Sequence, residues 1–101
     1  MSFTALESKL RALARERIQD GRLPNVQANR CWGGKGTGGA CVLCDEPIGS
    51  DDIEFEIEIA TDGAKRSYCL HALCHAAWKL ECVRAEFLRS AAQAKAESST
   101  P

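Results

Sequence analysis

Two pairs of metal-binding side chains, far apart in the chain, constrain the fold more than any other feature. Cys41 and Cys44 place two thiols three positions apart, and His71 and Cys74 place an imidazole and a thiol at the same spacing. Three cysteine sulfurs and one histidine nitrogen form a tetrahedral ligand set for zinc when the chain brings them together. The spacing therefore predicts a Cys3His zinc site made of these four residues.

Neighbouring residues leave alternatives to this ligand set. Cys69 lies two positions before His71 and can replace it, although a small buried thiol is the simpler interpretation. His75 points about 100° away from the adjacent ligand cysteine around a helix, so it is expected to pack or to cap unless it replaces a ligand. Cys31 and Cys82 are expected to be buried thiols, a second site, or a disulfide under oxidation.

The six cysteines also fit the disulfide framework of a secreted protein. Residues 1–7 lack the apolar run of a signal peptide, which favours a reduced, cytoplasmic protein and hence zinc. No apolar run is long enough to cross a membrane. A chain of 101 residues is expected to form one domain with a small core, which zinc binding would stabilise.

The charges are unevenly distributed along a chain whose net charge is -1. Residues 1–40 carry seven basic and three acidic side chains, whereas residues 41–80 carry three and eight. An excess of positive charge attracts nucleic acid or another anion, so the N-terminal arm is the expected contact region. An ordinary solvated helix face is the alternative. The predicted nucleic-acid-binding residues are Lys9, Arg11, Arg15, Arg17, Arg22 and Lys35.

The segment 1–22 is predicted to be an amphipathic helix. Thr4 and Glu7 fit a capping box, and apolar residues recur at helical spacing, so the helix is expected from about Thr4 to Asp20. Residues 23–40 are predicted to be a glycine-rich linker that leads flexibly to the first cysteine pair. Because no helix directly follows the glycines, a Walker phosphate loop is not expected.

Residues 41–94 are predicted to be a zinc-binding ββα module. Apolar residues alternate with glutamate from Ile53 to Ile59, which is typical of a strand with one buried face. The chain returns as a shorter strand over Lys65–Cys69 and so forms an antiparallel hairpin. The residues expected to face the core are Ile53, Phe55, Ile57 and Ile59, and those expected in solvent are Glu54, Glu56 and Glu58.

A long helix is predicted from Leu70 to about Ala94. Its first turn would carry His71 and Cys74 on one face, where the helix N-terminus favours the thiolate. Residues 95–101 are predicted to be a disordered tail. Apolar contacts are expected from Leu73, Ala77, Trp78, Leu80, Cys82, Val83, Phe87, Leu88 and Ala91.

These elements predict an α+β fold with an N-terminal helix, an antiparallel β-hairpin and a long C-terminal helix. The segment from Cys41 to Trp78, with Ile48 four residues after Cys44 and Trp78 four residues after Cys74, resembles the zinc finger of poly(ADP-ribose) polymerases. Those fingers recognise ends and breaks in DNA, so the resemblance implies DNA binding by a small zinc-stabilised, treble-clef-like domain. The ligand order also resembles the first half of a LIM module, whose partners are proteins.

Four protein donors complete the coordination shell of zinc and leave no water to activate, so a structural zinc in a non-enzymatic protein is predicted. The leading hypothesis is a small regulator that binds nucleic acid through its basic N-terminal arm. The alternative is a protein-interaction adaptor or a homodimer that uses the zinc module as a scaffold. The tryptophan and glycines from Trp32 to Gly38 resemble a run found in small bacterial proteins.

Overall fold

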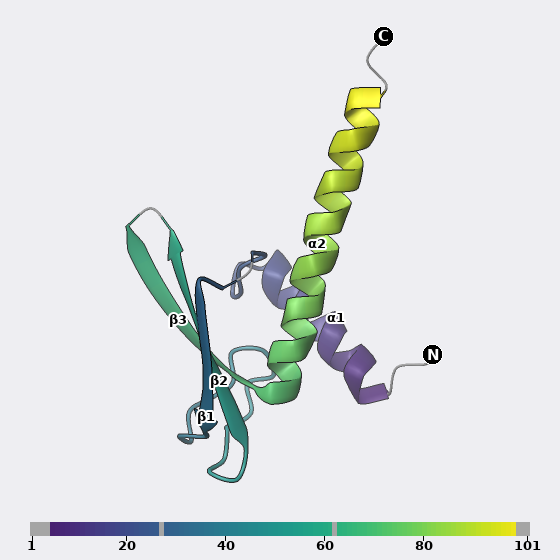
Figure 1. Ribbon diagram of the computed structural model, residues 1–101. Coiled ribbons are helices and arrows are strands. Elements are labelled where there is room, and N and C mark those ends of the chain that lie inside the picture. The colour runs from purple at the N-terminus through teal and green to yellow at the C-terminus, as the bar shows by residue number, and fades with distance from the viewer. Residues whose placement is uncertain (1–4, 27, 62, 99–101) are drawn as a thin grey trace.

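In its described residues, the chain is an α+β protein in which two helices pack beside a three-stranded antiparallel sheet (Figure 1). The computed structural model describes residues 5–26, 28–61 and 63–98. Within these residues, no helix has both the length and the apolar character that crossing a membrane requires. The elements in chain order are α1 (Ala5–Gln19), β1 (Arg30–Lys35), β2 (Ile53–Thr61), β3 (Ala64–His71) and α2 (Ala72–Ser98).

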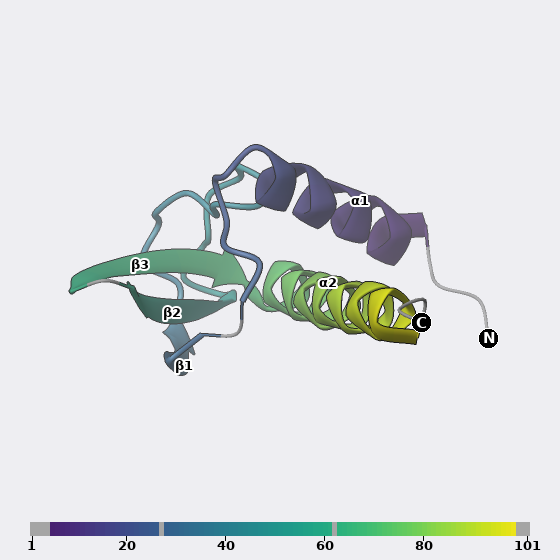
Figure 2. The same ribbon diagram turned by 90° about the horizontal axis from the view of Figure 1, so that it is seen from above.

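Helix α1 lies alongside α2 (Figure 2). Leu10 and Ala14, one turn apart, are buried in the core, whereas Leu6 near the start of the helix is exposed. Gly21 follows the helix with a φ of 83°, a left-handed conformation that favours glycine. The predicted N-terminal helix is therefore confirmed, while its expected first residue, Thr4, lies outside the described residues.

Part of the expected linker, residues 23–40, is an edge strand. Arg30–Lys35 pair antiparallel with β2, and Gly33 lies opposite Phe55. A Cβ at Gly33 would lie 3.2 Å from the Phe55 ring, so the glycine leaves room for this aromatic side chain. The glycines of β1 also remove the alternation of side chains that marks a strand. Pairing with β2, a contact distant in sequence, creates this strand.

The alternation in β2 differs in part from the expected one. Ile57 and Ile59 are buried, but Ile53, the first residue of the strand, is 58% exposed. Glu54 is only 8% exposed, because the amide and hydroxyl of Thr37 donate to its Oε1 at 3.1 and 3.0 Å. These hydrogen bonds lower the pKa of Glu54. The expectations of a buried Ile53 and a solvated Glu54 are therefore both wrong.

The glycines after β1 are hydrogen-bonded rather than a free approach to the first cysteine pair. The amides of Gly36 and Gly38 donate to the carbonyls of Asp52 and Ile48 at 3.0 and 2.8 Å. At Gly36 the two backbones approach so closely that a Cβ would collide with the carbonyl oxygen of Gly49. Glycine is required here by space.

Gly36→Ala is expected to destabilise the folded protein by about 2 kcal/mol or more, because the new methyl group must displace backbone atoms. Gly34→Ala is the matched control, since nothing lies within 4 Å of a Cβ at that position. Urea unfolding followed by circular dichroism measures both variants. Equal stabilities would contradict the close approach at Gly36.

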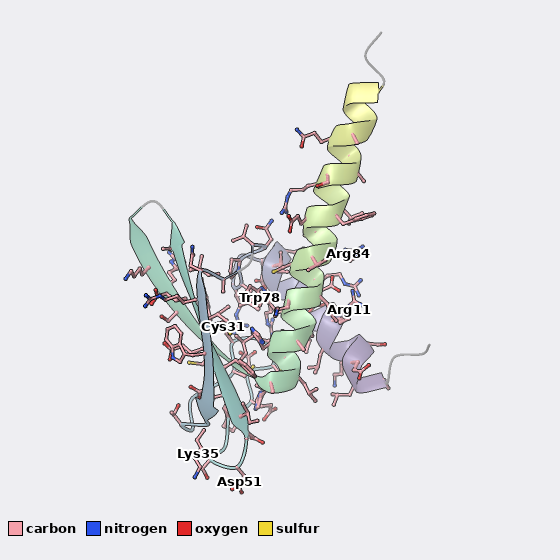
Figure 3. The ribbon with its side chains drawn as sticks, viewed as in Figure 1. Arg11, Cys31, Lys35, Asp51, Trp78 and Arg84 are labelled. Atoms are coloured by element: carbon pink, nitrogen blue, oxygen red, sulfur yellow. The ribbon has the colours of Figure 1, made fainter. Side chains whose placement is uncertain are left out.

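Helix α2 follows β3 directly and carries the largest core residue. Trp78 lies between α2 and the sheet (Figure 3), is fully buried, and donates its indole N–H to the carbonyl of Pro24 at 2.9 Å. The helix begins at Ala72, so His71 belongs to β3 and not to the first helical turn as expected. This difference arises because pairing with β2 extends β3 through His71, which lies opposite Glu54.

The far end of α2 also differs from the prediction. The helix continues to Ser98, past the expected end at Ala94, so the first four residues of the expected tail are helical. Residues 99–101 lie outside the described residues.

One side of α2 remains uncovered. The sheet packs on the opposite side and α1 packs along one edge, and the C-terminal part of the helix extends beyond α1 (Figure 1). Six apolar residues that were expected to make core contacts are consequently exposed. They are Leu73, Leu80, Val83, Phe87, Leu88 and Ala91.

Candidate metal site

The four predicted ligands converge although they come from three parts of the chain. Cys41 and Cys44 lie on the turn between β1 and β2, His71 ends β3, and Cys74 lies in the first turn of α2. Their ligand atoms all lie within 4.8 Å of one another. Nδ1 of His71 is 3.4 Å from Sγ of Cys44 and 3.9 Å from Sγ of Cys74.

The distances between the four ligand atoms are close to those around a tetrahedral zinc ion. Tetrahedral zinc, with bonds of about 2.3 Å to sulfur and about 2.0 Å to nitrogen, separates its ligand atoms by about 3.5–3.8 Å. The two sulfur–nitrogen distances lie on either side of this range, and separations near the 4.8 Å limit would contract by about 1 Å around an ion. Three thiolates and an imidazole also suit zinc chemically. The residues present therefore fit a zinc ion.

The ring of His71 is oriented by its second nitrogen. Nε2 lies 3.1 Å from the carbonyl oxygen of Pro47. Because a carbonyl only accepts hydrogen bonds, Nε2 must carry the proton, and a neutral ring then presents the lone pair of Nδ1 to the three sulfurs. A backbone carbonyl behind a histidine ligand is the usual device for fixing its tautomer.

In the absence of a metal ion, the surroundings of the three thiols favour ionisation of Cys41. A hydrogen bond from the Cys74 thiol, followed in importance by backbone amides of Cys44, His71 and Leu43, lowers the pKa of Cys41 to about 4. The same hydrogen bond to Cys41 raises the pKa of Cys74, and burial raises the pKa of Cys44. Cys41 is therefore the first thiol to ionise, and a cation would displace the remaining thiol protons.

The turn that carries the first two cysteines, residues 41–45, is bound by Arg17 of α1 and by Arg22 in the turn after it. Arg17 donates from Nε to the carbonyl of Leu43 at 2.9 Å and from Nη2 to Oδ2 of Asp45 at 3.1 Å. Arg22 donates from Nη2 to Oδ1 of Asp45 at 2.7 Å. The hydrogen bond from Arg22 is the main cause of the lowered pKa of Asp45. These contacts hold the cysteine turn against α1.

Arg17→Ala is expected to lower zinc affinity by about tenfold, because residues that orient ligands contribute to affinity without touching the metal. Arg15→Ala is the matched control, since Arg15 lies on the same helix but pairs with Glu81 instead of the cysteine turn. Competition with a chelator of known affinity measures both. Unchanged affinity in Arg17→Ala, or an equal loss in both variants, would contradict the role of Arg17.

The competing cysteines lie elsewhere. Cys69 groups with Glu54 and Glu56, with ligand atoms within 4.8 Å of one another. Burial, followed by Glu54, raises the pKa of Cys69 to about 11, so this thiol stays protonated near neutral pH. Burial also raises the pKa of Cys82 to about 11, and its Sγ lies 3.8 Å from the carbonyl oxygens of Pro24 and Val26. All six cysteines are free thiols, and Cys31, which was expected to be buried, is exposed on the edge strand β1, whereas Cys82 is buried.

The competing histidine packs against the sheet. The ring of His75 is stacked on Phe55, with centroids 4.6 Å apart, and its Nε2 lies 3.5 Å from Sγ of Cys31. Burial lowers the pKa of His75. His75 therefore lies outside the group of four ligand atoms.

The arginines predicted to contact nucleic acid bind acidic side chains of the chain itself. Arg11 donates from Nε to Oε2 of Glu81 at 2.8 Å, and Nε of Arg15 lies 3.0 Å from Oε1 in an ion pair whose geometry is not that of a hydrogen bond. Nη1 of Arg84 lies 3.9 Å from the same oxygen. Since the Glu81 side chain is only 1% exposed, these cations neutralise a buried charge.

The two lysines of the predicted nucleic-acid site line different grooves. Lys9 lines a groove of about 550 Å³ beside the Cys3His group, together with the apolar residues Leu10 and Leu13. Lys35 lines a second groove, and both grooves include Asp52 and Ile53. Lys35 lies at the end of the sheet distant from Arg11 (Figure 3).

The sequence patterns did not indicate the two acidic residues that make these contacts. Asp45 directly follows Cys44, and Glu81 is a single acid between Leu80 and Cys82 on a helix rich in apolar residues. An acid at a position that helical periodicity assigns to the core is a usable signal, because a buried carboxylate requires a cation.

No protein-family model, curated protein or solved structure matches this chain. The fold and the site of the described residues define an α+β protein with a three-stranded antiparallel sheet, two helices, and a Cys3His group that could hold a metal ion.

Proposed function

We propose that this chain is a non-enzymatic zinc protein whose Cys3His site is structural and whose function is contact with protein. The observation that carries the proposal is the convergence of the ligand atoms of Cys41, Cys44, His71 and Cys74 within 4.8 Å. The order of cysteine turn, antiparallel hairpin and helix supports a treble-clef-like arrangement. The three thiolate ligands favour a reducing, cytoplasmic location.

A structural role follows from the number and position of the ligands. Four protein donors complete the tetrahedral shell, so the bound zinc has no open position for water or substrate. The ligands join the cysteine turn, the end of β3 and the start of α2. Zinc would therefore connect segments distant in sequence, and its binding free energy would add to the stability of the fold.

Contact with protein is favoured over nucleic acid because the four arginines of the predicted nucleic-acid site already have acidic partners. Arg11 and Arg15 pair with Glu81, and Arg17 and Arg22 pair with Asp45. A phosphate backbone would have to compete with these carboxylates for each arginine. In contrast, the exposed apolar residues of α2 have no such competition, and exposed apolar surface is typical of protein interfaces.

Native mass spectrometry tests whether the chain binds a metal ion, and the absorption spectrum of the cobalt-substituted protein tests which ligands hold it. One bound ion per chain with the visible bands of a tetrahedral three-thiolate site is expected. A metal-free native chain, or a spectrum of four thiolates, would contradict the proposed ligand set.

The choice of partner is tested by fluorescence anisotropy with labelled duplex and single-stranded DNA at low salt. The proposal predicts no binding at micromolar protein. Binding that weakens steeply as salt is added would instead support the nucleic-acid hypothesis, because salt dependence reports displaced counterions.

A further inference from the structure

Helix α2 is apolar on two opposite faces. One face, which includes Trp78 and Cys82, is buried against the sheet and the loop before β1. On the opposite face, Leu73, Leu80, Val83 and Phe87 are 56%, 47%, 53% and 69% exposed. A helix that is apolar on both sides normally packs on both sides. We call the exposed row the outer stripe; it consists of Leu73, Ala76, Leu80, Val83 and Phe87.

The outer stripe has the spacing of a coiled coil. Leu73, Leu80 and Phe87 are separated by seven positions, and Ala76 and Val83 lie three positions after the first two of them. Apolar residues in this heptad pattern form a seam that meets another helix with the same pattern. The expected partner of the outer stripe is therefore a helix.

The outer stripe carries both a projecting side chain and a groove. Phe87 is its largest member and is 69% exposed. Around Ala76, its smallest member, lies an apolar groove of about 250 Å³ between α1 and α2. The apolar residues that line this groove are Leu10, Leu73, Ala76, Ala77 and Leu80.

We propose that two copies of this chain associate through their outer stripes in an antiparallel arrangement, with Phe87 of each copy in the groove beside Ala76 of the other. In an antiparallel pair of helices, the first apolar position of each heptad in one helix faces the second apolar position in the other. This pairing sets Phe87 against Ala76 and Leu80 against Val83. A two-fold interface must be self-complementary, and here both the projecting ring and its groove belong to the same stripe.

The flanking charges favour a second copy and this direction. Lys79 and Glu86 lie seven positions apart along the same edge of the outer stripe. In the antiparallel arrangement this edge meets its own counterpart, so each lysine lies near the glutamate of the other copy. A parallel arrangement would instead bring Lys79 near Arg84 of the other copy, which is repulsive.

In this homodimer a second copy of the chain is the protein partner of the proposed function, and the inference rests on that function. Its test is independent of the test of the metal site. Analytical ultracentrifugation of the zinc-loaded chain is expected to show a dimer that dissociates on dilution. Phe87→Glu should raise the dissociation constant at least tenfold while zinc content and helical circular dichroism stay unchanged. Leu88→Glu is the matched control, because Leu88 is 48% exposed and adjacent but lies about 100° away from the outer stripe.

A charge exchange tests the direction of the helices. Lys79→Glu should weaken the dimer by placing like charges together, and the double variant Lys79→Glu with Glu86→Lys should restore it. A zinc-loaded wild-type chain that stays monomeric at high micromolar concentration would overturn the homodimer and leave the zinc site standing. Equal dissociation constants for wild type and Phe87→Glu would also overturn it, and so would a double variant no tighter than Lys79→Glu alone.

Discussion

Cys74→Ser is expected to abolish stoichiometric zinc binding and to unfold the chain at neutral pH. Structural zinc contributes on the order of 10 kcal/mol in small zinc domains, which is comparable to the whole stability of a domain of this size. Cys74 is 3% exposed and provides the only ligand from α2, so its loss also disconnects the helix from the cysteine turn. Circular dichroism and native mass spectrometry measure fold and metal content together.

Cys69→Ser is the matched control for this experiment. Cys69 lies close in sequence to the second ligand pair, but its sulfur groups with Glu54 and Glu56 instead of the four ligands. The variant is expected to bind one zinc and to remain folded. If Cys69→Ser lost zinc while Cys74→Ser retained it, the ligand set would have to be exchanged.

Trp78→Ala is expected to destabilise the zinc-loaded protein by about 3–5 kcal/mol. The indole is completely buried between α2 and the sheet, so its removal leaves a large cavity in a small core. The carbonyl of Pro24 also loses the donor that now lies 2.9 Å away. Urea unfolding at saturating zinc separates this packing loss from any loss of metal.

Two further tryptophan variants calibrate this result. Trp78→Phe retains most of the volume but loses the indole N–H, so a smaller cost of about 1–2 kcal/mol is expected. Trp32→Ala removes a tryptophan that is 45% exposed on β1 and should change stability by about 0.5 kcal/mol or less. Similar costs for Trp32→Ala and Trp78→Ala would contradict the burial of Trp78.

The ligand group and the main elements around it were predictable from local patterns. The two-residue gaps within each ligand pair are a property of the sequence itself, because a tetrahedral ion accepts only donors that a short turn can bring together. Helix α1 and the hairpin of β2 and β3 follow from apolar periodicity and turn residues in the same way. These features depend on contacts between near neighbours.

The arrangement of the charges was not predictable in this way. The arginines of α1 form a basic face in the sequence, yet Asp45 and Glu81 bind four of the cations involved. Each of these pairs joins residues that lie far apart along the chain. A count of charges over a segment cannot reveal which of them meet after folding.

By itself, the sequence determined the Cys3His group that could hold a metal ion, the α+β class and the chain order of helix, hairpin and helix, because these depend on spacing and periodicity within short segments. Only the tertiary structure decided that Arg30–Lys35 form an edge strand, that Glu54 is buried, and which face of α2 stays exposed. The physical reason is that strand pairing, burial of a carboxylate and coverage of a helix face each need a partner from a distant part of the chain. A helix with two apolar faces predicts two contacts, and the fold shows which one the chain itself supplies.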